Sequence, residues 1–222
     1  PPGGGVLILA EGYPGTATEI GAEVYRKADE KRLRLYVEFP AALPGGGVAG
    51  PVRARLERAV VTSSAFSPTL ERLDLVAIHD CHYVPVDAVA GPHLVLAKVA
   101  GFDTAAYGID DVKVRPLLFE LPGRDVLVST TKLSQFVTAR YATKPALQAI
   151  WRMVFGWLRP GAPPVNLEWT PTVRPTYARD AALPADVARK ARDKVHLGWR
   201  LATHPLAGSI RLLRSPYRSL AL

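Results

Sequence analysis

Apolar residues gather in short runs separated by turns rich in glycine and proline, and this pattern predicts a sheet with few helices. Near-continuous apolar runs bounded by turn-prone residues are typical of buried strands. The strands expected on this basis are residues 6–10, 33–39, 58–62, 73–78 and 92–99. We expect these segments to share one sheet, with a glycine-rich surface loop at residues 41–51.

Two further runs, residues 115–121 and 125–131, are separated only by Pro122, Gly123 and Arg124. Such close spacing around turn residues predicts an antiparallel hairpin. The hairpin would add antiparallel strands to the sheet. We therefore expect a mixed sheet rather than the parallel sheet of a regular βαβ series.

Two segments show helical spacing. Thr16 and Glu19 stand at the spacing of a capping box and predict a helix that continues to about Glu30. The strand at 6–10, the glycine turn after it and this helix follow the order of a phosphate-binding loop. No Gly-Lys-Ser/Thr is present, so a tight turn is the preferred interpretation. Thr143 and Pro145 predict the start of a second helix. Its apolar face would contain Leu147, Ile150, Trp151, Val154 and Leu158, with Pro160 and Gly161 at its end.

The composition of the sequence changes at residues 160–164, where three of five residues are proline. We expect an α/β domain at residues 1–160 and a linker with an incomplete helical appendage at residues 161–222. The appendage contains one expected helix, residues 184–201, and one helix cannot bury its own apolar face. The chain begins Pro1-Pro2 without Met, so we also expect it to be a fragment of a longer product.

Charge is concentrated in the appendage. The whole chain carries a net charge of +8, and residues 171–222 hold ten Lys/Arg against three Asp, which gives +7 and leaves +1 for the rest. This basic segment has no nucleic-acid-binding motif, so no nucleic-acid partner is predicted. No apolar run approaches the roughly 20 residues that span a bilayer, so no membrane association is predicted either. One cysteine rules out an intrachain disulfide framework.

The densest cluster of chemically capable side chains follows the run at 73–78: His79, Asp80, Cys81 and His82. Open α/β sheets place their sites at the carboxyl ends of strands. Cys81 with His82 and Asp80 would make a candidate catalytic set, because a nearby imidazolium lowers the pKa of a thiol. Adjacent side chains of a strand point to opposite faces, however, and a small buried thiol is the competing interpretation.

The histidines also form a candidate metal site. His79, His82 and His93 could supply imidazole ligands, with Asp80 beside them. The competing interpretation is a polar strand end that is hydrogen-bonded to loop backbone. No cofactor is predicted.

Three stretches carry a family resemblance. They are the turn Glu11-Gly-Tyr-Pro-Gly-Thr-Ala17, the strand Leu35-Tyr-Val-Glu-Phe-Pro40, and the pair Leu117-Leu-Phe-Glu120 and Val126-Leu-Val-Ser-Thr-Thr-Lys-Leu-Ser134. Over residues 6–160 the chain resembles class I glutamine-amidotransferase-like domains, of the kind attached to bacterial glycoside-hydrolase-type proteins. The resemblance implies a three-layer, flavodoxin-like α/β fold with a mixed sheet and a C-terminal antiparallel hairpin.

The chain departs from that family at the catalytic residues. A working amidotransferase has its nucleophile in a Gly-x-Cys-x-Gly elbow and a later His-x-Glu pair. Cys81 is flanked by Asp80 and His82, and no His-x-Glu follows it. The resemblance therefore implies the fold without the amidotransferase activity.

The expected function is a non-catalytic accessory or assembly domain of a bacterial carbohydrate-processing protein. Two alternatives stay open: a cysteine-dependent hydrolase or amidotransferase-like enzyme that uses Cys81, and a small-ligand or metal-binding module. Residues 169–204 resemble the lead-in to a helical catalytic module, which would be the partner within the same parent protein. A homo-oligomer is a further option. The resemblance would fit a periplasmic or secreted bacterial protein.

Overall fold

The structure is a computed structural model that describes residues 3–78, 81–134, 144–165 and 167. The chain divides into two units, residues 1–168 and 169–222, and everything below concerns the first. The helix expected at 184–201 lies outside the described residues, and the boundary expected at residue 160 stays a prediction.

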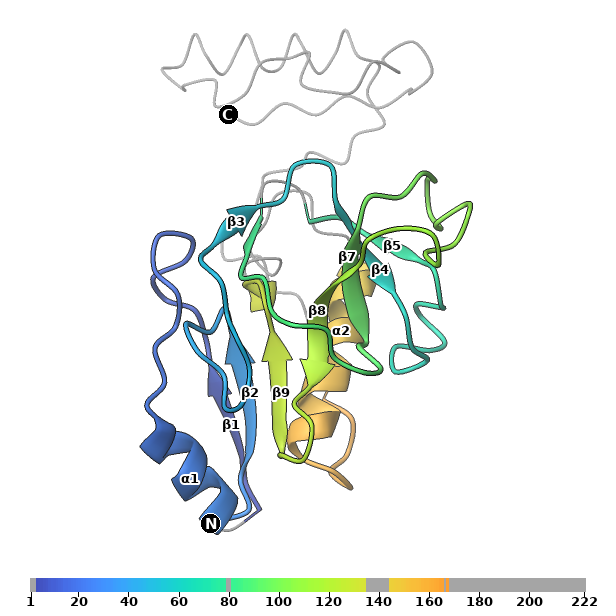
Figure 1. The fold of residues 1–222 in the computed structure, drawn as a ribbon. Helices are drawn as coiled ribbons and strands as arrows, with labels where there is room; N and C mark the ends of the chain where they lie inside the picture. Colours follow the sequence, from blue (N-terminus) through green and yellow to red (C-terminus); the bar gives the residue numbers. More distant parts are fainter. Residues whose placement is uncertain (1–2, 79–80, 135–143, 166, 168–222) are drawn as a thin grey trace, which may run out of the picture. The chain divides into compact units, whose positions relative to one another are not determined.

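Seven strands of the described residues form one curled mixed sheet, in the order β1-β2-β9-β8-β7-β4-β5 (Figure 1). The strands are β1 (Gly5–Ile8), β2 (Arg34–Glu38), β4 (Arg58–Val61), β5 (Leu75–Val76), β7 (Leu94–Ala97), β8 (Arg115–Glu120) and β9 (Val126–Ser129). The pairs β1–β2 and β2–β9 are parallel, whereas each later pair is antiparallel. The five segments that were expected to share a sheet do so.

The stretch at 73–78 corrects the sequence interpretation. It was expected to be a buried strand running on to the polar cluster, but only Leu75 and Val76 are strand residues, at the edge of the sheet and antiparallel to β4. Leu73 has a φ of 74°, a left-handed conformation that interrupts a strand. The amide of Leu75 donates instead to the carbonyl of Asp103 at 2.8 Å.

Beyond β5 the chain changes sheets. His82 and Tyr83 form β6, which pairs antiparallel with β3 (Val52–Arg53) in a separate two-stranded sheet. The polar cluster therefore does not lie at the carboxyl end of a buried parallel strand. His79 and Asp80 themselves lie outside the described residues.

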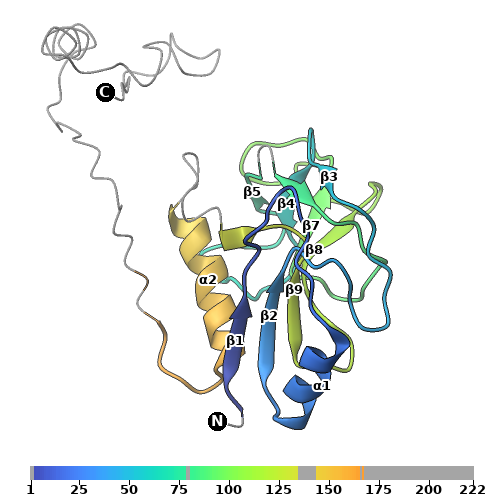
Figure 2. The ribbon, with the colours of Figure 1, turned by 90° about the vertical axis from the view of Figure 1, so that its left-hand side faces the viewer.

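The two described helices, α1 (Ala22–Glu30) and α2 (Lys144–Leu158), cover opposite faces of the sheet (Figure 2). The alternation along β2 makes this possible, because successive side chains of a strand point to opposite faces. Leu35 and Val37 belong to the apolar cluster that contains residues of α1, and Tyr36 to the cluster that contains residues of α2. The fold is thus of the α/β class.

Helix α1 begins later than the capping-box spacing predicted. Its N-cap is Gly21, and no side chain caps it. Thr18 pairs with the chain that follows β2: its amide donates to the Phe39 carbonyl at 2.7 Å, and its carbonyl accepts from the Ala41 amide at 2.8 Å. This extended pairing is incompatible with a helix at Thr18, so the expectation for residues 16–19 was wrong.

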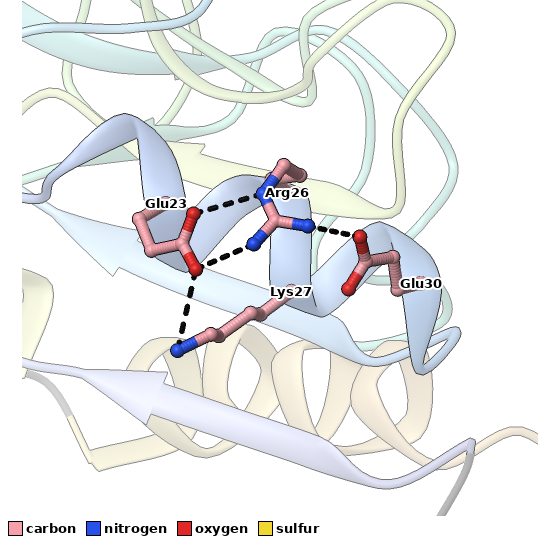
Figure 3. Close-up of polar contacts among 4 residues, drawn as sticks. All are labelled: Glu23, Arg26, Lys27 and Glu30. Atoms are coloured by element: carbon pink, nitrogen blue, oxygen red, sulfur yellow. Dashed lines mark hydrogen bonds and ion pairs between the residues drawn. The ribbon is translucent and has the colours of Figure 1, made fainter.

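The exposed face of α1 carries a small ion-pair network (Figure 3). Arg26 pairs with Glu23 and with Glu30, and Lys27 lies 3.3 Å from Glu23. These spacings of three and four residues place the charges side by side on a helix. The side chains are more than half exposed, so the network contributes little to stability.

Helix α2 agrees with the spacing that predicted it. Ile150, Trp151 and Val154 are buried against the sheet, and the Trp151 ring lies 5.6 Å from the Tyr36 ring. The core position expected for Trp151 is therefore confirmed. Neither described helix has the length and apolar character needed to cross a membrane.

Candidate functional site

Buried polar side chains collect where the parallel strands β2 and β9 end. Glu38 is the last residue of β2, and Ser129, the last residue of β9, is followed by Thr130 and Thr131. All four side chains are at most 1% exposed. The carboxyl ends of parallel strands are the usual location of sites in open α/β sheets, so this edge is the first place to look for chemistry.

The Glu38 carboxylate is held by donors from three parts of the chain. Its Oε1 accepts from the Tyr36 hydroxyl at 3.0 Å and from the Ser134 amide at 2.7 Å. Its Oε2 accepts from the Ser134 hydroxyl at 2.7 Å and from the Ala10 amide at 3.3 Å. A buried carboxylate is costly unless it is hydrogen-bonded in this way. The four bonds tie the chain after β1, the end of β2 and the segment beyond β9 to one another.

The electrostatics of this edge favour a fixed arrangement. Burial raises the pKa of Tyr36 well above its usual value, and the charge and hydrogen bond of Glu38 raise it further. Tyr36 therefore remains a protonated donor. Because Glu38 is 0% exposed, its carboxylate cannot meet a solute without a rearrangement of the edge.

Cys81 lies next to a second tyrosine, the partly buried Tyr13. The thiol is 2% exposed and belongs to the apolar cluster under α2. Burial raises the pKa of Tyr13; the hydrogen bond to the His82 backbone opposes this rise, and the charged form of Cys81 adds to it. Cys81 and Tyr13 are therefore neighbours, which sequence spacing could not show, because 68 positions separate them.

Tyr13 and Thr131 both bind the backbone of His82. The Tyr13 hydroxyl donates to the His82 carbonyl at 3.2 Å and accepts from the His82 amide. The Thr131 hydroxyl donates to the same carbonyl at 2.7 Å. The imidazole itself is partly exposed and lies edge-on to the Tyr13 ring, with centroids 6.3 Å apart. Whether Cys81, His82 and Asp80 act as a catalytic set stays a prediction, because Asp80 is outside the described residues.

His93 lies in a different setting. It precedes β7, with Nδ1 3.0 Å from the Ser63 hydroxyl and Nε2 3.4 Å from the Glu120 carboxylate. Protein groups thus occupy both of its ring nitrogens. In the part of the chain that the structure describes, no three His, Cys, Asp or Glu side chains are placed to hold a metal ion. The proposed ligand set of His79, His82 and His93 includes a residue outside that part and stays a prediction.

Two surface pockets open on the described part of the chain, and the lining of the first flanks Ala10, whose amide binds Glu38. One, of about 400 Å³, lies along the end of β1 and the turn that follows it, between Leu7 and Thr18. The other, of about 750 Å³, is lined by Val52, Arg53, Arg55, Leu56, Glu57 and Lys98. We call the second the β3–β4 pocket. Sequence reasoning missed it because its basic residues match no motif and come from two distant segments.

Comparison with known proteins gives limited matches. A family of GrdX-like proteins matches residues 174–222, less than half of the chain. No curated protein matches. Among solved structures, the chain is similar to one titled "Crystal structure of Agd3 a novel carbohydrate deacetylase", with 12% identity and a TM-score of 0.43. That match covers 70% of this chain and 24% of the other, so the chain spans about a quarter of the length of that protein.

Proposed function

We propose that residues 1–160 are a non-catalytic accessory or assembly domain of a bacterial carbohydrate-processing protein. The observation that carries the proposal is the sealed edge of the sheet. Glu38, Ser129, Thr130 and Thr131 lie where an α/β enzyme would expose its reacting groups, yet they are at most 1% exposed. A general acid or base must come within hydrogen-bond reach of its substrate, and these groups instead bind one another and the backbone.

The proposal includes the finer description of the fold. The domain is a flavodoxin-like, three-layer member of the glutamine-amidotransferase-like class, with β8 and β9 as its C-terminal hairpin. Helices on opposite faces of the sheet support the layering, and the antiparallel pairing of β8 with β9 supports the hairpin. The antiparallel strands β7, β4 and β5 would extend the sheet beyond that hairpin.

The partner under this proposal is a helical catalytic module of the same parent protein. The accessory domain would then act on substrate capture or on assembly, and the chemical step would belong to the module. Deleting residues 1–160 from the parent protein should preserve kcat on a small soluble substrate and reduce turnover of polysaccharide or change the assembly state. An unchanged turnover of polysaccharide together with an unchanged assembly state would reject the proposal.

The rival function, an enzyme that uses Cys81, has its own test. We expect Cys81→Ala to leave kcat of the parent protein unchanged, and the 222-residue chain to release no more glutamate from glutamine than this variant does. Labelling of the thiol by a disulfide reagent should be slow in the native chain and fast in urea, because the side chain is 2% exposed. A large fall in kcat for a variant with a native circular dichroism spectrum would establish the enzyme instead.

A further inference from the structure

The β3–β4 pocket combines positive charge with exposed apolar surface. Its lining has three cationic side chains and one carboxylate, a net charge of +2. Val52 is 41% exposed and Leu56 is 74% exposed. The pocket lies beside the antiparallel half of the sheet, since Lys98 directly follows β7 and Glu57 directly precedes β4. It is separate from the buried edge around Glu38.

The carboxylate of Glu57 is used within the turn. It accepts from the amides of Arg55 at 2.8 Å and Leu56 at 3.1 Å, and it lies 3.8 Å from Lys98 Nζ. Burial opposes the charged form, but these amides and Lys98 together lower the pKa of Glu57 below its usual value. The acidic group is thus ionised and turned toward the turn itself. It organises the pocket and offsets the charge of Lys98.

The Arg55 guanidinium takes part in no ion pair among the described residues, so it can bind a ligand. Its amide donates to Glu57, so the backbone that carries this side chain is held in the turn. A guanidinium prefers planar, bidentate acceptors such as carboxylates. The pocket therefore presents a carboxylate-binding group beside the exposed side chain of Leu56.

The apolar side chains of the lining are Val52 and Leu56. Apolar side chains beside a cation suit a ligand that has apolar CH faces and carboxylates on the same molecule.

We propose that the β3–β4 pocket binds an acidic polysaccharide through the carboxylates of its uronic acid units. The choice of a carbohydrate rests on the proposed accessory function. The carboxylates bind Arg55, and the CH faces of the sugar rings cover Leu56 and Val52. A nucleic acid is the less suitable polyanion, since its binding sites use long basic grooves and stacking platforms rather than a compact pocket with a net charge of +2.

The test uses the complete 222-residue chain and isothermal titration calorimetry at about physiological ionic strength, where exposed charges farther apart than about 8 Å are largely screened. The ligands are an oligogalacturonate and its methyl ester, which share a backbone and differ in charge. We expect the acid to bind, the ester to bind far more weakly, and Arg55→Glu to reduce affinity for the acid about tenfold or more. Leu56→Ala, which leaves the charge unchanged, should reduce it about threefold.

Lys31→Glu is the matched control. Lys31 is exposed at the end of α1, far from β3 and β4, and its reversal changes the net charge by the same amount as Arg55→Glu (Figure 1). We expect this control to leave the affinity within about twofold. If Arg55→Glu and Lys31→Glu reduced the affinity equally, binding would depend on the net charge of the chain, including the basic residues beyond 170, and not on the pocket. That result would overturn the inference.

Other results would overturn it as well. These are no binding of the acid, equal binding of acid and ester, no loss on Leu56→Ala, or tighter binding of a DNA oligonucleotide with the same dependence on Arg55. If Arg55→Glu lacked a native circular dichroism spectrum, Leu56→Ala and the ester would decide. A failure here leaves the accessory role standing when deletion of residues 1–160 still impairs the parent protein. Failure of both experiments rejects the accessory role too.

Discussion

Removing the Glu38 carboxylate should destabilise the parallel half of the sheet more than any exposed charge does. Glu38→Ala takes away the acceptor of four hydrogen bonds, two from main-chain amides and two from hydroxyls. The hydroxyls of Tyr36 and Ser134 can rotate toward other acceptors. The amides of Ala10 and Ser134 cannot, because the backbone fixes their direction.

The magnitude follows from those two amides. A buried donor without an acceptor costs about 1–3 kcal/mol, and the Ser134 amide, at 2.7 Å, makes the stronger of the two bonds. With the cavity left by the side chain, we expect Glu38→Ala to lower the free energy of opening by at least about 3 kcal/mol. Glu38→Gln keeps one oxygen for Tyr36 and the Ser134 amide, and its NH₂ can donate to the Ser134 hydroxyl. Its only mismatch is the long bond from Ala10, so we expect about 1–2 kcal/mol.

Hydrogen exchange of peptides that cover β2 and β9 measures this opening directly. Glu30→Ala is the matched control, since it removes a carboxylate that is 55% exposed on α1, and it should leave exchange in β2 and β9 unchanged. A loss below about 1 kcal/mol for Glu38→Ala would show that the network is not structural. An equal loss for the alanine and glutamine variants would show that the charge matters and not the geometry.

Three further results are expected. The folded-state pKa of Glu57 is lowered, so its stabilisation of the β3–β4 turn is complete above its usual pKa and is lost as the pH falls through the lowered value. Amide hydrogen exchange in this turn should become faster over that pH range, and Glu57→Gln should remove this pH dependence. Trp151→Ala should cost about 3–5 kcal/mol in urea unfolding, because it empties a core position that is 7% exposed, whereas Arg152→Ala on the exposed face should cost little. The pKa of Tyr36 is raised in the folded state, so its protonated hydroxyl stabilises the fold fully below the usual tyrosine pKa. This stabilisation is lost as the pH rises through the raised value, and the phenolate absorbance of Tyr36 should therefore appear only with alkaline unfolding.

The sequence predicted most of the sheet because the information is local. Each run at 6–10, 33–39, 58–62 and 92–99 overlaps a strand of the observed sheet, and hydrophobic runs between turn residues are enough to locate strands. Helix α2 was predictable for the same reason, since its buried face repeats at helical spacing. These elements need no distant partner to be recognised.

The errors arise where distant segments compete with local preference. Thr18 has a helix-like context, but its backbone pairs with Phe39 and Ala41 beyond β2. Leu75 begins an apolar run, but its strand is limited by Leu73 in a left-handed conformation and by pairing with the loop at Asp103. Neither contact leaves a signal within a window of neighbouring residues.

The candidate site was hidden for a related reason. Glu38 sits in an alternating strand, where a glutamate is usually the exposed residue of the pattern. Its donors come from Ala10, 28 residues earlier, and Ser134, 96 residues later. Cys81 and His82 were visible as reactive types, but their burial and backbone contacts were not. Composition can name such residues, and only the fold decides whether a solute reaches them.

Burial gives the charged groups of this domain two separate roles. At the parallel end of the sheet, Glu38 is fully buried and satisfied by four donors, so it stabilises one arrangement and has no capacity left for a ligand. At the antiparallel end, Arg55 lines an open pocket and is held only through its backbone. The exposed guanidinium of Arg55 stays hydrated until a ligand arrives, and it can then bind a carboxylate in a bidentate manner. Under the proposed accessory function, this contrast directs the search for a ligand to the β3–β4 pocket rather than to the strand ends.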